Sequence, residues 1–129
     1  MIKRITCSKA PSPRGPYSHA VRAGDFIYVS GQAAINPETD QPEHSTAAAE
    51  TRRTLENVKA ILNAAGADLS DVVKCSIFLT DIRDFAEMNQ VYDEYFGDCK
   101  PARTTVQATL PALGLKVEVD CVAYKPLAE

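Results

Sequence analysis

Long apolar segments are absent from this 129-residue sequence. The longest runs are short, such as residues 26–29, and none approaches the ~20 apolar residues that a membrane-spanning helix needs. No apolar stretch of the kind found in a secretory signal follows the first methionine. The four cysteines, Cys7, Cys75, Cys99 and Cys121, form no Cys-x-x-Cys pair. We therefore expect free thiols and a reducing, cytoplasmic location.

Signatures of metal, nucleic-acid and cofactor binding are also missing. The sequence has only two histidines, neither beside a cysteine, so we expect no metal site. A formal charge of −3 and the lack of a long basic run argue against a nucleic-acid partner. The sequence contains no glycine-rich phosphate loop, no Gly-x-Ser-x-Gly elbow and no His-Glu-x-x-His motif. Nucleotide hydrolysis, serine hydrolysis and zinc proteolysis lack their usual residues, and no cofactor is predicted.

The composition is that of one globular domain spanning residues 1–129. Hydrophobic residues make up 45% of the chain and charged residues 24%. A chain of this length buries roughly two thirds of its unfolded surface, so it can form a core without disulfides or metals. Residues 11–16 contain three prolines and are predicted to form an ordered loop that leads into Tyr17.

Two segments have helical periodicity. Between residues 46 and 65, apolar and small side chains recur at steps of four and three, and Gly66 can end this helix in a left-handed conformation. A second helix is predicted to begin with the capping pair Asp84 and Glu87 and to continue until Gly97. We interpret its apolar stripe as core packing; the stripe contains Phe85, Met88, Tyr92 and Tyr95.

The remaining elements are predicted strands. They cover residues 19–22, 26–30, 72–79, 103–110 and 115–124, and the first residues can add another. The last two alternate polar and apolar side chains and are predicted to be antiparallel neighbours. The order of elements predicts an α+β two-layer sandwich, in which a mixed, mostly antiparallel sheet carries two helices on one face. We expect its other face to carry Arg103, Thr105, Gln107 and Glu118.

A possible site for a small carboxylate involves the last two of these strands. Arg103 lies on a strand beside hydroxyl residues, and Glu118 lies on the following strand. A guanidinium group binds both oxygens of a carboxylate in plane, and a nearby glutamate can orient or deprotonate a water molecule. On spacing alone, a cross-strand ion pair is the more common explanation of such a pair.

Blocks along nearly the whole chain resemble the RidA (YjgF, L-PSP) family of reactive intermediate deaminases. They include Gly-Pro-Tyr-Ser at residues 15–18, Val-Ser-Gly-Gln at 29–32 and the helical stretch 54–62. Further matches are residues 10–11, 36–37, 65–66, 73–74, 78–81, 85–89, 92–96, 110–111 and 116–123. The most informative block is Pro-Ala-Arg-Thr-Thr-Val at residues 101–106, because deaminase-active members of the family resemble one another there.

The resemblance implies both a fold and an activity. The fold is similar to that of chorismate mutase, and it forms a homotrimer with its sites in clefts between subunits. The activity is the hydrolysis of enamines and imines to 2-keto acids and ammonia, without a cofactor. The implied ligands are small 2-imino and 2-keto acids, including 2-aminoacrylate/2-iminopropanoate and 2-iminobutanoate.

The resemblance also assigns roles to individual residues. Arg103 matches the residue that binds the substrate carboxylate, and Glu118 matches the carboxylate that positions the attacking water. Where the family often has cysteine, this chain has Thr105, so a thiol takes no part there and the backbone of Thr105 is expected to hold substrate or water. The full set of predicted substrate-binding residues is Tyr17, Gly31, Asn89, Arg103 and Thr105.

Two other functions stay open at this point. A non-catalytic module that binds or senses a small carboxylic acid would need Arg103 but not Glu118. An RNA-directed role, as translation inhibitor or ribonuclease, is attributed to some members of the family that the sequence resembles. The chain's acidic net charge argues against the second alternative.

Overall fold

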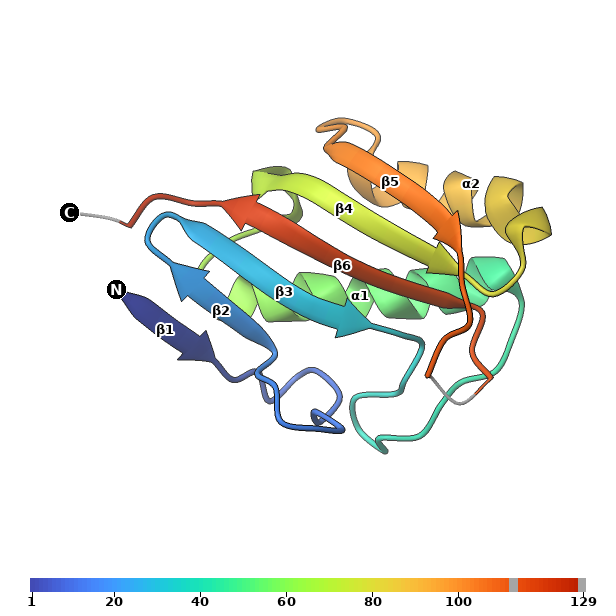
Figure 1. Ribbon diagram of the computed structural model, residues 1–129, viewed down its shortest axis with the longest axis horizontal. Helices are drawn as coiled ribbons and strands as arrows, with labels where there is room; N and C mark the ends of the chain where they lie inside the picture. Colours follow the sequence, from blue (N-terminus) through green and yellow to red (C-terminus); the bar gives the residue numbers. More distant parts are fainter. Residues whose placement is uncertain (112–113, 128–129) are drawn as a thin grey trace.

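The computed structural model of the protein describes residues 1–111 and 114–127. A six-stranded sheet forms one layer and two helices form the other, behind the sheet as drawn in Figure 1. The helices are α1 (Ala47–Ala64) and α2 (Phe85–Phe96), and two short 3-10 helices are η1 (Leu69–Asp71) and η2 (Ile82–Asp84). The strands are β1 (Ile2–Ile5), β2 (Ala20–Ala23), β3 (Phe26–Gln32), β4 (Val72–Leu79), β5 (Ala102–Gln107) and β6 (Val117–Tyr124). The predicted α+β sandwich with both helices on one face is confirmed.

The strand order in the sheet is β1-β2-β3-β6-β4-β5. Every neighbouring pair is antiparallel except β4 and β5, which are parallel and are joined by the crossover through α2. The predicted pairing of the last two strands is therefore wrong, because β6 lies between β3 and β4 while β5 forms an edge. Alternate side chains of β6 are buried, whereas β5 has no buried residue, so the more apolar strand takes the central position.

The bounds of both helices agree with the sequence prediction, but the predicted capping pair of α2 is wrong. Thr46 caps α1 by accepting a hydrogen bond from the Ala49 amide at 3.1 Å, and Gly66 follows the helix with φ +83°. The Asp84 side chain makes no capping hydrogen bond to α2. Glu87 instead accepts a hydrogen bond from the Ala48 amide at 2.7 Å, so its charge stabilises the N-terminus of the neighbouring helix.

The main core lies between the sheet and the two helices. Cys75 and Cys121 are register partners on β4 and β6 and are both buried there. Burial raises the pKa of the Cys75 thiol to about 11, so this group stays protonated. The largest fully buried side chains include Ile27, Leu55, Ile61, Leu62, Ile77, Leu79, Met88 and Phe96. Within the described ranges, no helix is long and apolar enough to cross a membrane.

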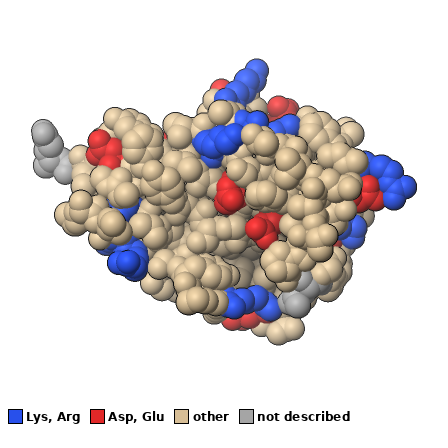
Figure 2. All heavy atoms as spheres, viewed as in Figure 1, with Lys and Arg blue, Asp and Glu red and all other residues tan. Residues whose placement is uncertain are grey.

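Neither helix covers the other face of the sheet, which we call the open face. It is more apolar than predicted from the sequence, because the strands direct several large apolar side chains toward it. Figure 2 shows this face as mainly uncharged, with acidic side chains near its centre. The exposed apolar side chains on it include Phe26, Tyr28, Val106 and Tyr124.

Candidate functional site

Arg103 points toward the helix side of the sheet. Its register partner on the parallel neighbour β4 is Cys75, which belongs to the core. Nη1 of Arg103 donates a hydrogen bond to Oδ1 of Asn89 at 2.7 Å. The guanidinium carbon lies 4.6 Å from the ring centroid of Tyr92 and 5.5 Å from that of Phe85. No carboxylate among residues 1–111 and 114–127 lies within ion-pair distance of this arginine.

Thr105 lies on the same side of β5 as Arg103. It pairs with Ile77 of the core, and its hydroxyl oxygen is buried without a hydrogen-bond partner in the part of the chain that the structure describes. Beside Arg103, a hollow of about 200 Å³ is lined by residues of α2 and of the loop that follows it, including Asn89, Tyr92 and Lys100. The guanidinium group of Arg103 therefore borders an open space large enough for a small acid.

Glu118 points to the open face. Its register partner on β4 is Phe78, while its neighbours along β6, Val117 and Val119, are buried in the core. A Cβ atom on residue 31 would lie only 2.6 Å from Oε2 of Glu118, so Gly31 leaves the space that this carboxylate occupies. Burial, and then the nearby charge of Asp120, raise the pKa of Glu118.

Tyr17 lies in the proline-rich loop, and its side chain is 46% exposed. Its hydroxyl accepts a hydrogen bond from the Arg14 amide at 3.1 Å. Buried His19 anchors the same loop with both ring nitrogens. Its Nδ1 accepts a hydrogen bond from the Cys7 amide at 3.0 Å. Nε2 therefore carries the proton and donates a hydrogen bond to the Pro11 carbonyl at 2.7 Å. Tyr17, Gly31 and Glu118 share a hollow of about 290 Å³.

The structure thus divides the predicted site residues into two groups on opposite sides of the sheet. Arg103 and Thr105 of β5 and Asn89 of α2 form the arginine group, on the helix side of the sheet. Tyr17, Gly31 and Glu118 form the glutamate group, on the open face and at its margin. The prediction that the open face carries Arg103, Thr105 and Gln107 is wrong, since β5 runs parallel to β4 and its odd-numbered residues follow Cys75, Ile77 and Leu79 toward the helices.

Two aromatic residues contribute to the site in a way that was not predicted from the sequence. Core packing explains Met88, which is fully buried, but Phe85 and Tyr92 of the same stripe also contact the guanidinium group of Arg103. The available signal was their spacing, because Phe85, Asn89 and Tyr92 occupy positions i, i+4 and i+7 on one face of a helix.

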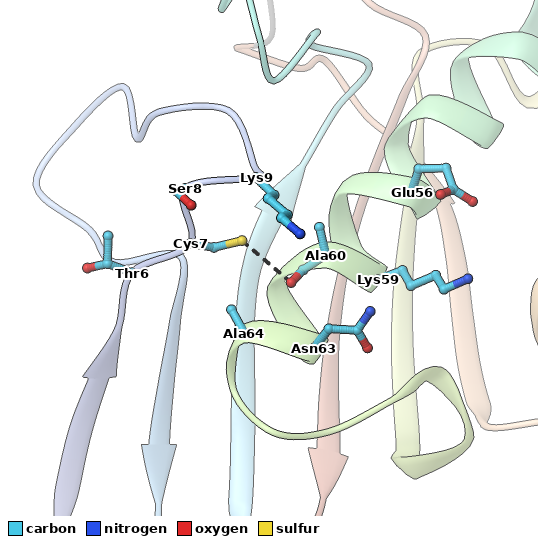
Figure 3. A pocket seen from close by; sticks show the side chains of 9 residues that line it. All are labelled: Thr6, Cys7, Ser8, Lys9, Glu56, Lys59, Ala60, Asn63 and Ala64. Atoms are coloured by element: carbon cyan, nitrogen blue, oxygen red, sulfur yellow. Dashed lines mark hydrogen bonds between the residues drawn. The ribbon is translucent and has the colours of Figure 1, made fainter.

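Another hollow, of about 440 Å³, lies between the N-terminal loop and α1 and contains none of the predicted site residues (Figure 3). Lys9 reaches toward α1 across it, whereas the Lys59 side chain points away from the loop. The Cys7 thiol is turned to the Ala60 carbonyl, and Glu56 accepts a hydrogen bond from the Tyr95 hydroxyl. No cluster of metal-ligating side chains is present in the described ranges.

Comparison with known proteins places the chain in a family. A model of the family described as Endoribonuclease L-PSP matches residues 7–125. A RutC family protein of Pyrococcus abyssi is 48% identical over 121 residues, which are 94% of this chain and 95% of that protein. The chloroplastic Reactive Intermediate Deaminase A of Arabidopsis thaliana is 39% identical over 92% of this chain and 64% of its own length. The crystal structure of E. coli TdcF with bound serine has a TM-score of 0.89 and 36% identity, over 95% of this chain and 98% of that one. The chain therefore belongs to the L-PSP family, which includes the RidA proteins that its sequence resembles.

Proposed function

We propose that the protein hydrolyses small 2-imino acids and their enamine tautomers, such as 2-iminopropanoate and 2-iminobutanoate, to 2-keto acids and ammonia. The observation that carries this proposal is the state of Arg103, a half-buried cation held by Asn89 and two aromatic rings with no carboxylate partner in the described part of its own chain. Such an arginine is suited to bind the carboxylate of a ligand. A deaminase relative and the serine-bound TdcF structure support a small amino-acid-like ligand.

The proposed mechanism uses the raised pKa of Glu118. The N–H groups of Arg103 that Asn89 leaves free bind the substrate carboxylate and hold its C=N carbon near the glutamate. Water adds its oxygen to the carbon of the protonated imine while Glu118 accepts one of its protons. Glu118 then returns that proton to the amino group of the carbinolamine. The C–N bond breaks, ammonia takes up the hydroxyl proton, and the 2-keto acid is released as the carbonyl forms.

The complete site requires two copies of the chain. Within one chain the arginine group and the glutamate group lie on opposite sides of the sheet. We propose that the arginine group of one subunit meets the glutamate group of the next in a closed ring, a trimer as the family resemblance implies. The apolar open face supplies surface that such an assembly would bury, since Phe26, Tyr28 and Tyr124 are each exposed by 40% or more.

Mixing two inactive variants tests this function and this assembly together. A dehydratase acting on threonine would generate 2-iminobutanoate, and the rate of 2-oxobutanoate formation would be followed with and without the protein. We expect Arg103→Ala and Glu118→Gln each to lose most of the acceleration and to keep a small, measurable residual rate. In a ring co-assembled from equal amounts of both, half of the arginine groups and half of the glutamate groups are intact, so about a quarter of the sites regain both.

The other outcomes identify the alternatives. An inactive mixture, with an active wild type and with exchange of subunits verified, would show that the two groups of neighbouring subunits do not form a common site. If the wild type gives no acceleration but binds 2-oxobutanoate, and Glu118→Gln binds it equally, the protein is a binding module. RNA cleavage with a steep dependence on salt would instead support the ribonuclease activity that the family description names.

A further inference from the structure

Three side chains of α2 approach the guanidinium group of Arg103 from one side of the helix. Asn89 accepts a hydrogen bond from Arg103, and the rings of Phe85 and Tyr92 also contact the guanidinium group. Phe85 lies four residues before Asn89 in the helix and Tyr92 three residues after it. Tyr92 is the closer of the two rings, at 4.6 Å against 5.5 Å. It is also the more deeply placed, with 8% of its surface exposed against 39% for Phe85.

The surroundings of Tyr92 hold its ring in place. The ring packs on Phe96, with 4.8 Å between the two centroids, and it borders the hollow that contains Arg103. Its hydroxyl is buried beside the Cys75 thiol and has no well-formed hydrogen bond within the described residues. Burial and that neighbour raise the pKa of Tyr92, so the ring meets Arg103 as a neutral phenol and the contact is a cation–π interaction rather than an ion pair.

We propose that Tyr92 is a positioning residue for substrate binding, acting through Arg103. This inference rests on the proposed function and deepens it. An arginine on an edge strand without a carboxylate partner can adopt several rotamers, and each of them points its N–H groups in a different direction. The Tyr92 ring fixes the plane of the guanidinium group, while Asn89 occupies one N–H of Nη1. The remaining N–H groups are thereby directed toward an incoming carboxylate before it binds, which lowers the entropy lost on binding.

Substitutions at Tyr92 separate this role from simple core packing. Tyr92→Leu keeps an apolar side chain but removes the aromatic face, whereas Tyr92→Phe keeps the face and removes only the hydroxyl. The matched control is Tyr95→Leu on the same helix, because Tyr95 is partly buried and bonds to Glu56 rather than to Arg103. In the imine assay we expect Tyr92→Leu to raise KM by about 5- to 30-fold with little change in kcat. Tyr92→Phe and Tyr95→Leu should keep the wild-type KM.

A lower kcat with an unchanged KM in Tyr92→Leu would overturn the proposal, since that pattern indicates loss of folded, active protein. Calorimetric titration with 2-oxobutanoate gives a second test that does not depend on turnover. We expect its Kd to rise in Tyr92→Leu by the same factor as KM and to recover in Tyr92→Phe. Equal Kd values in wild type and Tyr92→Leu, or no binding to the wild type, refute the positioning role. Normal binding without hydrolysis would refute only the proposed function.

Discussion

Replacing Gly31 with alanine tests the position of the Glu118 carboxylate without removing it. An alanine Cβ would lie 2.6 Å from Oε2 and 3.0 Å from Cδ, whereas ordinary contact begins at 3.4 Å. The carboxylate must therefore retreat by about 0.8 Å, and misplacement of a reacting group on the order of 1 Å can lower a rate about 100-fold. We expect kcat/KM for imine hydrolysis to fall by about 10- to 100-fold.

The same substitution should leave the fold intact. The obstructing atoms belong to the end of a flexible side chain, and the φ of Gly31 lies outside the left-handed region that disfavours alanine. Removing a glycine also restricts the unfolded chain and can add about 0.4–1 kcal/mol to the free energy of unfolding. Thermal unfolding should therefore show a Tm equal to or slightly above that of the wild type.

A double-mutant cycle decides whether Gly31 acts through Glu118. If it does, adding Gly31→Ala to Glu118→Gln should cause no further loss in the coupled 2-oxobutanoate assay, because the group that alanine displaces has already lost its function. Full activity in Gly31→Ala, or an additional loss in the double variant, would refute the reasoning. A large fall in Tm would show that the backbone, rather than the carboxylate, had moved.

Three further predictions concern stability. Because the pKa of Glu118 is raised, the folded state favours the protonated carboxyl and loses stability as pH rises through that pKa. Glu118→Gln should therefore unfold at a higher temperature than wild type in alkaline buffer but not in acid. The opposite trend would contradict the direction of the pKa shift. Glu50→Ala should lower the free energy of unfolding by about 2–4 kcal/mol in urea titrations, because the buried Glu50 carboxylate accepts hydrogen bonds from the Ser45 and Lys116 amides. A loss below about 1 kcal/mol would show that those amides find other partners. Leu55→Ala should cost about 2–5 kcal/mol by the same method, and an unchanged midpoint would contradict its place in the core.

Most of the secondary structure follows from local pattern. The strand at Val72–Leu79 has the predicted bounds, and α1 begins after Thr46 as its periodicity indicates. Such patterns depend on neighbours three, four or two residues away, so they can be recognised without knowledge of the fold. The capping of α2 was not predictable in this way, because Glu87 is used by a helix whose first turn lies 39 residues earlier.

The sequence by itself determined which residues to consider: Arg103, Glu118 and the blocks shared with the L-PSP family. It also determined the two helices, the strands and their layering, because each depends on periodicity along the chain. Only the tertiary structure decided that Arg103 and Glu118 face opposite sides of the sheet, since this depends on the edge position of β5 and its parallel pairing with β4. The contact of Tyr92 with Arg103 likewise depends on how α2 packs beside β5, and alternation within a single strand contains no information about that packing.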